Sequence, residues 1–168
     1  NRASTISIRM LSRRQDQIIS PAFLTERVRA AWEYRKKVID TSSCRLLFGE
    51  ADFLPGLTVD KYEDILVVES LALGIDRLKG YLLAALVRVL AEDGIAVRGI
   101  YERNDAPTRQ KEGLPLYKGW WDGAEALDTH VLVHENGLSF SLDLENSQKT
   151  GFFLDQKYNR AAVARLAA

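Results

Sequence analysis

The chain has 168 residues, of which 46% are apolar, enough for one domain with a hydrophobic core. No apolar run approaches the ~20 residues that cross a bilayer, and the N-terminus lacks the pattern of a signal peptide. The single cysteine, Cys44, cannot form an internal disulfide. We therefore expect a globular, cytoplasmic protein without a membrane partner.

The formal charge of zero is unevenly distributed along the chain. Residues 1–37 hold nine basic and three acidic side chains, a net charge of +6, so the remainder carries −6. A net charge of zero argues against a protein whose whole surface binds polyanions. The basic part is either a solvated helix face with a turn, or an edge that faces phosphates.

The N-terminal third predicts a strand and then a helix. Residues 4–11 alternate, with Ile6, Ile8 and Met10 on one face, as in a half-buried strand. Ser20 is a suitable N-cap and Pro21 a suitable first residue for the helix that follows. The predicted buried face of this helix comprises Leu24, Val28, Ala31, Arg35 and Val38.

The middle of the chain predicts an antiparallel meander, a helix and a strand. Three short β-like segments at 44–49, 56–61 and 64–71 are separated by turn residues. A helix is expected over 75–94 and a strand over 95–101. The apolar stripe of the helix comprises Ile75, Leu78, Leu82, Leu86 and Val89, and Gly94 is placed to end it.

Residues 103–128 show no sustained periodicity, which is typical of a functional or disordered connection. After them, Asn136-Gly137 between two alternating segments predicts a β-hairpin. The sequence therefore predicts an α+β fold with a mainly antiparallel sheet, two main helices and a C-terminal helical segment.

Several candidate sites are weak. His130 and His134, four apart on a strand, would lie ~13 Å from each other, too far to share one metal ion. Cys44 opens an apolar strand and is expected to be a buried structural thiol. Glu50, Asp52 and Asp60 could serve a hydrolase as acid and base, but turn carboxylates are common. We predict no metal site.

Two stretches have more chemical character. "YERNDAPTRQKEG" (101–113) presents charged groups after a strand, and they form either a functional loop or a salt-bridged surface loop. "ENSQKTGFFLDQKYNR" (145–160) places Phe152 and Phe153 after Gly151, and Asp155 is expected to cap a helix that Gln156 begins. The two rings either stack on an adenine or cover an exposed hydrophobic seam.

Three long strings carry a resemblance to a known family: "RLLFGEADFLPGLTVDKYEDILVV", "IYERNDAPTRQKEGL" and "ENGLSFSLDLENSQKTGFFLDQKYNR". They resemble the bacterial class I methyltransferases that modify cytosine C5 in 23S rRNA. The resemblance implies an N-terminal RNA-binding PUA domain, a central α+β domain and a C-terminal Rossmann-like domain that binds S-adenosylmethionine.

By this resemblance, residues 1–20 are the last strand of the PUA domain, 21–144 the central domain, and 145–168 the start of the Rossmann-like methyltransferase domain. The sequence contains neither the family's glycine-containing cofactor loop nor its Asp-Pro-Pro and catalytic cysteine segments, and Cys44 does not match that cysteine. We therefore expect no catalytic residue in this chain and no activity of the chain alone.

The resemblance also assigns site residues. Those on the cofactor side are Lys149, Thr150, Phe152, Phe153, Asp155 and Gln156. Those facing RNA or the cleft are Arg103, Asp105, Arg109 and Glu112. The implied cofactor is S-adenosylmethionine, held tightly only by the full-length enzyme, and the implied partners are 23S rRNA and, in full-length form, a second copy.

Two other hypotheses remain open: a non-catalytic RNA- or protein-binding module that uses the basic part and residues 103–128, and a hydrolase that uses Glu50, Asp52 and Asp60. Under the methyltransferase hypothesis, we expect Phe152 and Phe153 to be exposed or folded back onto the domain. Residues 155–168 are expected to form a helix that is docked less well than in the parent enzyme.

Overall fold

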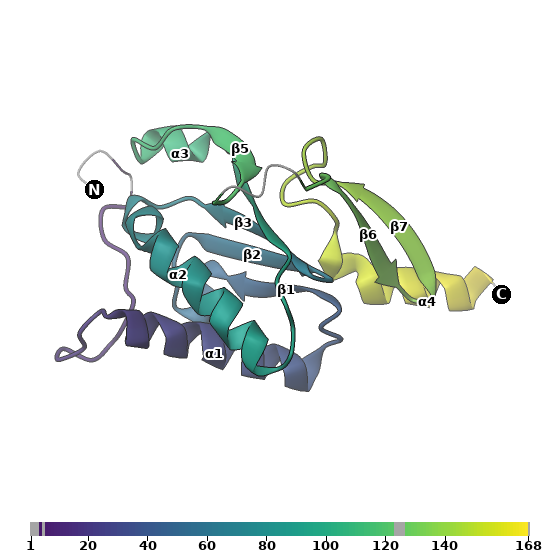
Figure 1. Ribbon diagram of the computed structural model, residues 1–168, viewed down its shortest axis with the longest axis horizontal. Helices are drawn as coiled ribbons and strands as arrows, with labels where there is room; N and C mark the ends of the chain where they lie inside the picture. Colours follow the sequence, from purple (N-terminus) through teal and green to yellow (C-terminus); the bar gives the residue numbers. More distant parts are fainter. Residues whose placement is uncertain (1–3, 5, 123–126, 168) are drawn as a thin grey trace.

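The computed structural model describes residue 4, residues 6–122 and residues 127–167 (Figure 1). Its elements are α1 (Pro21–Val38), β1 (Ser43–Phe48), β2 (Leu57–Tyr62), β3 (Ile65–Ser70), α2 (Leu73–Glu92), β4 (Gly99–Asn104), α3 (Thr108–Lys111), β5 (Tyr117–Trp120), β6 (His130–Glu135), β7 (Leu138–Asp143) and α4 (Lys157–Ala167). Short 3₁₀ turns occupy Gly49–Asp52 and Leu154–Gln156. The predicted α+β fold is confirmed.

The main sheet has five strands in the order β1-β2-β3-β4-β5. Its neighbours pair antiparallel except for β3 and β4, which are parallel because α2 carries the chain back between them. The predicted three-strand meander is therefore confirmed as β1 to β3.

The two long helices lie together on one face of this sheet (Figure 1). Ser20 caps α1 as predicted, its Oγ accepting a hydrogen bond from the Phe23 N–H at 3.2 Å. The predicted faces are buried against the sheet, except that Val38, the last residue of α1, is exposed and Leu78 is only partly buried. Gly94 follows α2 with a φ of +76°, as expected of a helix-ending glycine.

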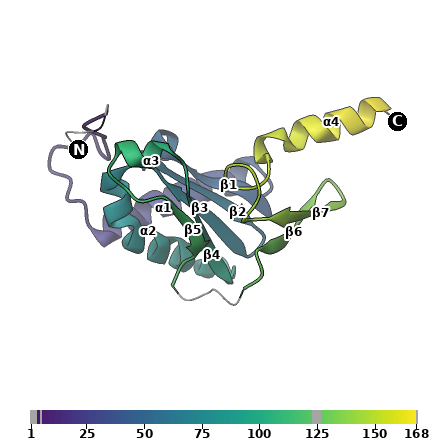
Figure 2. The same cartoon turned by 90° about the horizontal axis from the view of Figure 1, so that it is seen from above.

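The hairpin of β6 and β7 forms a separate two-stranded sheet. Its turn is the predicted one, with Asn136 and Gly137 at φ +53° and +79°. It packs on the sheet face opposite the helices through a second apolar core that comprises Tyr62, Ile65, Val67, Tyr101, Val131, Val133, Leu142 and Leu144. The hairpin and α4 lie at the end of the molecule away from the N-terminus in both views (Figures 1 and 2).

The strand predicted over residues 4–11 is wrong: the described residues of this segment form no strand. Ile6, Ile8 and Met10 are exposed. An alternating pattern makes a strand only where a neighbour satisfies its backbone hydrogen bonds, and none of the described strands pairs with this segment.

Three further boundaries differ from the prediction. The strand expected over 95–101 is β4 (Gly99–Asn104), so Arg103 lies within it rather than in a loop. The connection expected over 103–128 contains α3 and β5, and residues 123–126 lie outside the described residues. The helix expected from Gln156 begins at Lys157, after a 3₁₀ turn that contains Asp155.

Candidate functional site

The C-terminal segment and the start of the main sheet enclose a groove of about 640 Å³. One wall comes from residues 148–158 and the other from Ile39 and Asp40, which follow α1, and from β1. All six residues predicted on the cofactor side line this groove: Lys149, Thr150, Phe152, Phe153, Asp155 and Gln156. The structure therefore brings them together, and their contact with a cofactor stays a prediction.

A tight turn shapes the first wall. Lys149 has a φ of +53° and Gly151 a φ of +135°. A Cβ at Gly151 would lie 3.0 Å from Leu142 Cδ2 and 3.1 Å from the Tyr62 hydroxyl. Only glycine fits this backbone without displacing its neighbours, because it tolerates the positive φ and needs no room for a side chain.

The main sheet holds this turn through two buried side chains of β2. The Tyr62 hydroxyl accepts a hydrogen bond from the Phe152 N–H at 2.9 Å and donates to the Phe152 carbonyl at 3.3 Å. The Thr150 hydroxyl donates to Asp60, which also accepts two hydrogen bonds from Arg45 at 2.8 and 2.9 Å. Burial raises the pKa of Tyr62, so this hydroxyl keeps its proton.

Ion pairs fix the first turn of α4. Lys157 Nζ lies 2.5 Å from Asp40 Oδ2, and this hydrogen bond lowers the Asp40 pKa to about 2. Arg160 binds Glu135 through two bonds of 2.6 and 2.7 Å and donates to the Phe153 carbonyl at 2.9 Å. The later part of α4 projects from the body of the molecule (Figure 2). The second half of this helix is exposed up to Ala167, whereas docking of 155–168 less well than in the parent enzyme, and its amide exchange, stay predictions.

The two phenylalanines have different environments. Phe152 is partly buried, packs against Phe140 at a centroid distance of 5.0 Å, and lies under the Arg160 guanidinium at 4.4 Å. Phe153 is 47% exposed, and Lys149 Nζ lies 5.7 Å from its ring centroid. Phe152 is therefore folded back onto the domain, whereas Phe153 can receive a ligand.

The opposite wall was not predicted from the sequence. Phe48 lines the groove with 54% of its surface exposed, and the Arg45 guanidinium lies 5.2 Å from its ring centroid. Ser43 also lines the groove, and its Oγ is buried without a hydrogen-bond partner in the described part of the chain. Cys44 is buried as predicted, and burial raises its pKa to about 11, so it is no nucleophile at neutral pH.

The loop expected to face RNA or the cleft is largely built into the body of the molecule. Arg103, Arg109 and Glu112 are buried, and Asp105 is the exposed member of the four. Arg103 donates to the Leu144 and Ser147 carbonyls, and so links the sheet to the start of the C-terminal segment. Contact of these four side chains with RNA or with a cleft stays a prediction.

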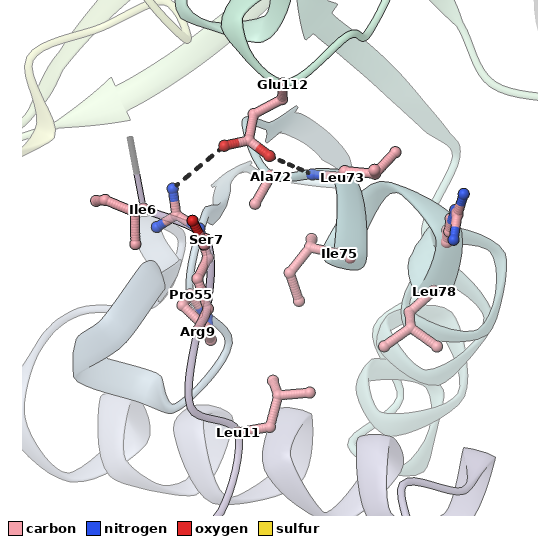
Figure 3. A pocket seen from close by; sticks show the side chains of 12 residues that line it. Ile6, Ser7, Arg9, Leu11, Pro55, Ala72, Leu73, Ile75, Leu78 and Glu112 are labelled. Atoms are coloured by element: carbon pink, nitrogen blue, oxygen red, sulfur yellow. Dashed lines mark hydrogen bonds and ion pairs between the residues drawn. The ribbon is translucent and has the colours of Figure 1, made fainter. Parts of the chain in front are cut away.

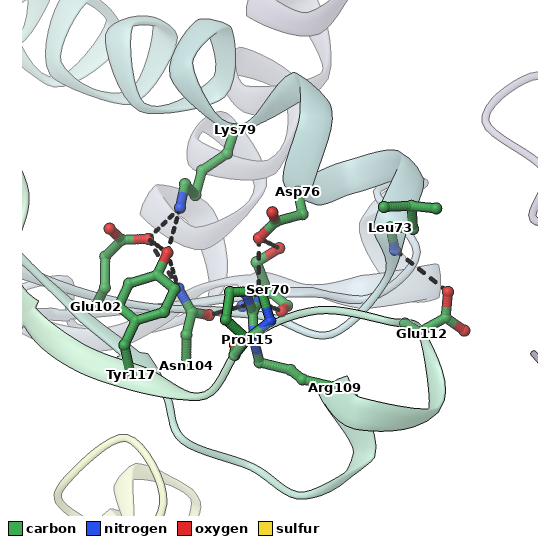
Figure 4. A network of polar contacts seen from close by, with 10 residues as sticks. All are labelled: Ser70, Leu73, Asp76, Lys79, Glu102, Asn104, Arg109, Glu112, Pro115 and Tyr117. Carbon is green, nitrogen blue, oxygen red and sulfur yellow. Dashed lines mark hydrogen bonds and ion pairs between the residues drawn. The ribbon is translucent and has the colours of Figure 1, made fainter.

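Arg109 lies within a buried polar network below α2 (Figure 4). It bonds to Asp76 at 3.0 Å, to Asn104 at 3.1 Å and to the Ser70 carbonyl. Lys79 meets Glu102 at 2.6 Å in the same network. The sequence left two alternatives for this segment, a functional loop or a salt-bridged surface loop. Arg109 fits neither, because it forms a buried ion pair.

Glu112 reaches the start of α2, beside a smaller cavity of about 260 Å³ (Figure 3). Its carboxylate accepts a hydrogen bond from the Leu73 N–H at 3.3 Å, and its other oxygen faces Arg9 at 3.9 Å. The N-cap residue Ala72 has no side-chain acceptor, so Glu112 takes over the capping role from a distant part of the chain.

The carboxylates of the hydrolase hypothesis do not share a site. Asp52 binds Arg35 through two bonds of 2.7 Å, Asp60 binds Arg45, and Glu50 pairs with Arg9. No group of three or more metal-ligating side chains occurs among the described residues. The described residues also contain no helix that is long and apolar enough to span a membrane.

The basic N-terminal part is largely paired with acidic groups. Arg29 binds Glu92, and Lys36 binds Asp93. Both acidic residues lie at the end of α2, so these pairs join the two helices. Such local neutralisation favours the interpretation of this part as a solvated helix face.

Comparisons with known proteins identify relatives over almost the whole chain. It is 39% identical over 167 residues to ribosomal RNA large subunit methyltransferase I of Pseudoalteromonas translucida, and 38% identical over 166 residues to the protein of that name from Shewanella amazonensis. These alignments cover 98% and 97% of this chain, but 41% and 40% of the relatives. No family model matches the chain.

Two solved structures share the fold. One, from Streptococcus mutans, is described as a SAM-dependent methyltransferase, with a TM-score of 0.69, 21% identity, and coverage of 88% of this chain and 36% of that one. The other, SMU.776, is a methyltransferase structure in complex with SAH, with a TM-score of 0.68, 20% identity, and coverage of 87% and 36%. Nearly the whole chain thus aligns with these two ribosomal RNA large subunit methyltransferase I proteins, and it spans about two fifths of the length of each.

Proposed function

We propose that the chain is the central part of an S-adenosylmethionine-dependent methyltransferase that acts on 23S rRNA, and that residues 148–158 form one wall of its methyl-donor site. The observation that carries this proposal is the meeting of all six cofactor-side residues in one groove. The similarity to rRNA methyltransferases over 98% of the chain supports it. A groove of about 640 Å³ is also within the usual size of a small-molecule site.

The six predicted residues of this wall have roles that fit a nucleoside ligand, either in contact with it or by positioning the turn. The exposed ring of Phe153 stacks on the adenine, while Asp155 and Gln156 bond the base edge or the ribose. Lys149, whose Nζ lies 5.7 Å from the Phe153 ring centroid, adds a positive charge to this wall. Thr150 and Phe152 have a positioning role: they hold the turn in place through their hydrogen bonds to Asp60 and Tyr62.

The finer proposal is methylation of cytosine C5. S-adenosylmethionine supplies an electrophilic methyl group when bound, and C5 of cytosine becomes nucleophilic once a thiolate has attacked C6. Cys44 cannot supply that thiolate, because it is buried with a raised pKa of about 11. In this proposal the nucleophile of the cytoplasmic enzyme is supplied from outside residues 1–168, and the chain alone is inactive.

Titration of the isotopically labelled chain with S-adenosylhomocysteine tests the donor wall, because amide chemical shifts report binding even at millimolar affinity. We expect shifts in residues 149–156, reduced in Phe153→Ala. Phe53→Ala is a matched control, since Phe53 is also 47% exposed and lies 4.7 Å from a guanidinium, that of Arg27, but does not line the groove. Equal effects of the two substitutions would refute the donor wall.

A further inference from the structure

The wall opposite the donor has a chemical character of its own. Phe48 is more exposed than Phe153, at 54% against 47%, and its ring is accompanied by a cation, as that of Phe153 is. An exposed ring that lines a groove offers a face on which a nucleobase can stack. The groove therefore has an aromatic ring with a basic neighbour on each of its two walls.

Arg45 is fixed beside Phe48, and not all of its N–H donors are used in holding it there. Its Nε and Nη2 bind Asp60, a fully buried carboxylate on β2. Those bonds hold the guanidinium in place and raise its pKa, so it remains charged. Nη1 forms no hydrogen bond within the residues that the structure describes, and an oriented guanidinium suits a phosphate oxygen.

Ser43 adds an unused polar group to the same wall. It is 5% exposed, it lines the groove, and no hydrogen bond to its Oγ is formed in the described part of the chain. A buried hydroxyl without a partner is uncommon in a folded protein, because desolvation costs free energy. This Oγ has almost no solvent-exposed surface, so it lies behind the surface of the groove and is assigned no contact with a ligand.

The acidic groups that face the groove do not exclude a phosphate. Asp40 is neutralised by Lys157 at 2.5 Å, and Asp60 is buried behind Arg45. Asp155 belongs to the donor wall, where a ribose or the donor's positive charge suits it. Arg45 thus gives the opposite wall a positive group at the place where Phe48 is open.

We propose that Phe48 and Arg45 form a subsite for one unpaired base of single-stranded RNA, with the base stacked on Phe48 and its phosphate on Arg45. The choice of RNA rests on the proposed function. If the methyl donor occupies the 148–158 wall, the acceptor base must lie close to it, and the facing wall lines the same groove. A base that receives a methyl group must also leave its stack, and aromatic stacking stabilises it outside the duplex.

Fluorescence anisotropy of the whole chain with a labelled single-stranded RNA of roughly ten nucleotides tests this subsite. We expect Phe48→Ala to weaken binding about tenfold, since one stacked base is lost, and Phe48→Trp to retain it. The matched control is again Phe53→Ala, which should bind like the unaltered chain. The duplex of the same sequence should bind more weakly than the single strand. Unchanged melting temperatures establish that the exposed-site variants are folded.

The outcomes separate this proposal from the donor wall. One outcome is that Phe48→Ala loses RNA binding while S-adenosylhomocysteine shifts no amide signal of the unaltered chain. That outcome would support the stacking subsite and refute the donor wall. Equal RNA affinity of Phe48→Ala and Phe53→Ala, or equal affinity for single strand and duplex, would overturn the subsite even if S-adenosylhomocysteine binds as proposed.

Discussion

The hydroxyl of Tyr62 bonds to both main-chain polar groups of Phe152, a residue 90 positions later in the chain. Tyr62 is fully buried on β2, so its position is set by the main sheet and by the second core. The groove turn is therefore held by the body of the domain, although it belongs to the C-terminal segment.

Tyr62→Phe tests that link. It keeps the ring but leaves the Phe152 N–H without its partner, so we expect a loss of about 1–3 kcal/mol in the free energy of unfolding. Urea denaturation measures the loss, and amide exchange should be faster at residues 150–153. Tyr81→Phe, at an exposed tyrosine on α2, is the control and should change neither. Unchanged exchange at 150–153 in Tyr62→Phe would show that the hydroxyl does not hold the turn.

Gly151→Ala should destabilise the protein by more than about 1 kcal/mol, because of the positive φ and the contacts at 3.0 and 3.1 Å. Gly80 provides the opposite case: it lies within α2, and an added Cβ meets nothing within 4 Å. Gly80→Ala should stabilise by about 0.5–1 kcal/mol through helix propensity. Thermal unfolding of both variants gives the comparison, and a stabilising Gly151→Ala would contradict the described turn.

Asp40 makes the anchoring of α4 dependent on pH. Its pKa is lowered from 3.8 to about 2 by Lys157, so the native state favours the ionised form. The resulting stability is present above pH 4 and lost as the pH falls towards 2. Because the Asp40 side chain is 56% exposed, solvent screening reduces its size to about 1 kcal/mol. Asp40→Asn should therefore be less stable than the unaltered chain at pH 7 and match it near pH 2. A constant difference across this range would contradict the ion pair.

Arg109→Lys tests the buried network. Lysine retains the charge but cannot supply the guanidinium's fork to Asp76 and Asn104, so we expect a loss of about 3 kcal/mol. Arg88→Lys is the control, since that side chain is 73% exposed on α2 and should change stability by less than about 0.5 kcal/mol. Urea titration of both variants measures the difference. Equal stability of the two would indicate that the network contributes nothing to the fold.

The sequence predicted correctly those features that depend on a few adjacent residues. Ser20 and Pro21 gave the start of α1, and Asn136-Gly137 gave the hairpin turn, because caps and tight turns depend on a few adjacent residues. Residues 4–11 have a strand-like pattern too, but a strand needs a partner that only the three-dimensional structure reveals.

The Phe48 wall escaped prediction for a specific reason. Strict alternation would place Phe48 on the same face as the buried Cys44 and Leu46. A β-bulge between Arg45 and Leu47 changes the register, so that Phe48 is exposed and lies beside Arg45. Arg109 shows the reverse case, since a charged residue in a loop-like segment is buried because β3 and α2, distant in the sequence, and the neighbouring β4 supply its partners.

Transfer of tritiated methyl groups from S-adenosylmethionine to 23S rRNA transcripts tests the central claim most directly. The two proteins to compare are Asn1–Ala168 and the product of the complete reading frame that encodes it. We predict no transfer by Asn1–Ala168, transfer to cytosine C5 by the longer protein, and at least about tenfold lower kcat/KM in its Phe153→Ala variant. Transfer by Asn1–Ala168 alone, or an unchanged kcat/KM in the Phe153→Ala variant, would contradict the assignment of this chain as one wall of the methyl-donor site.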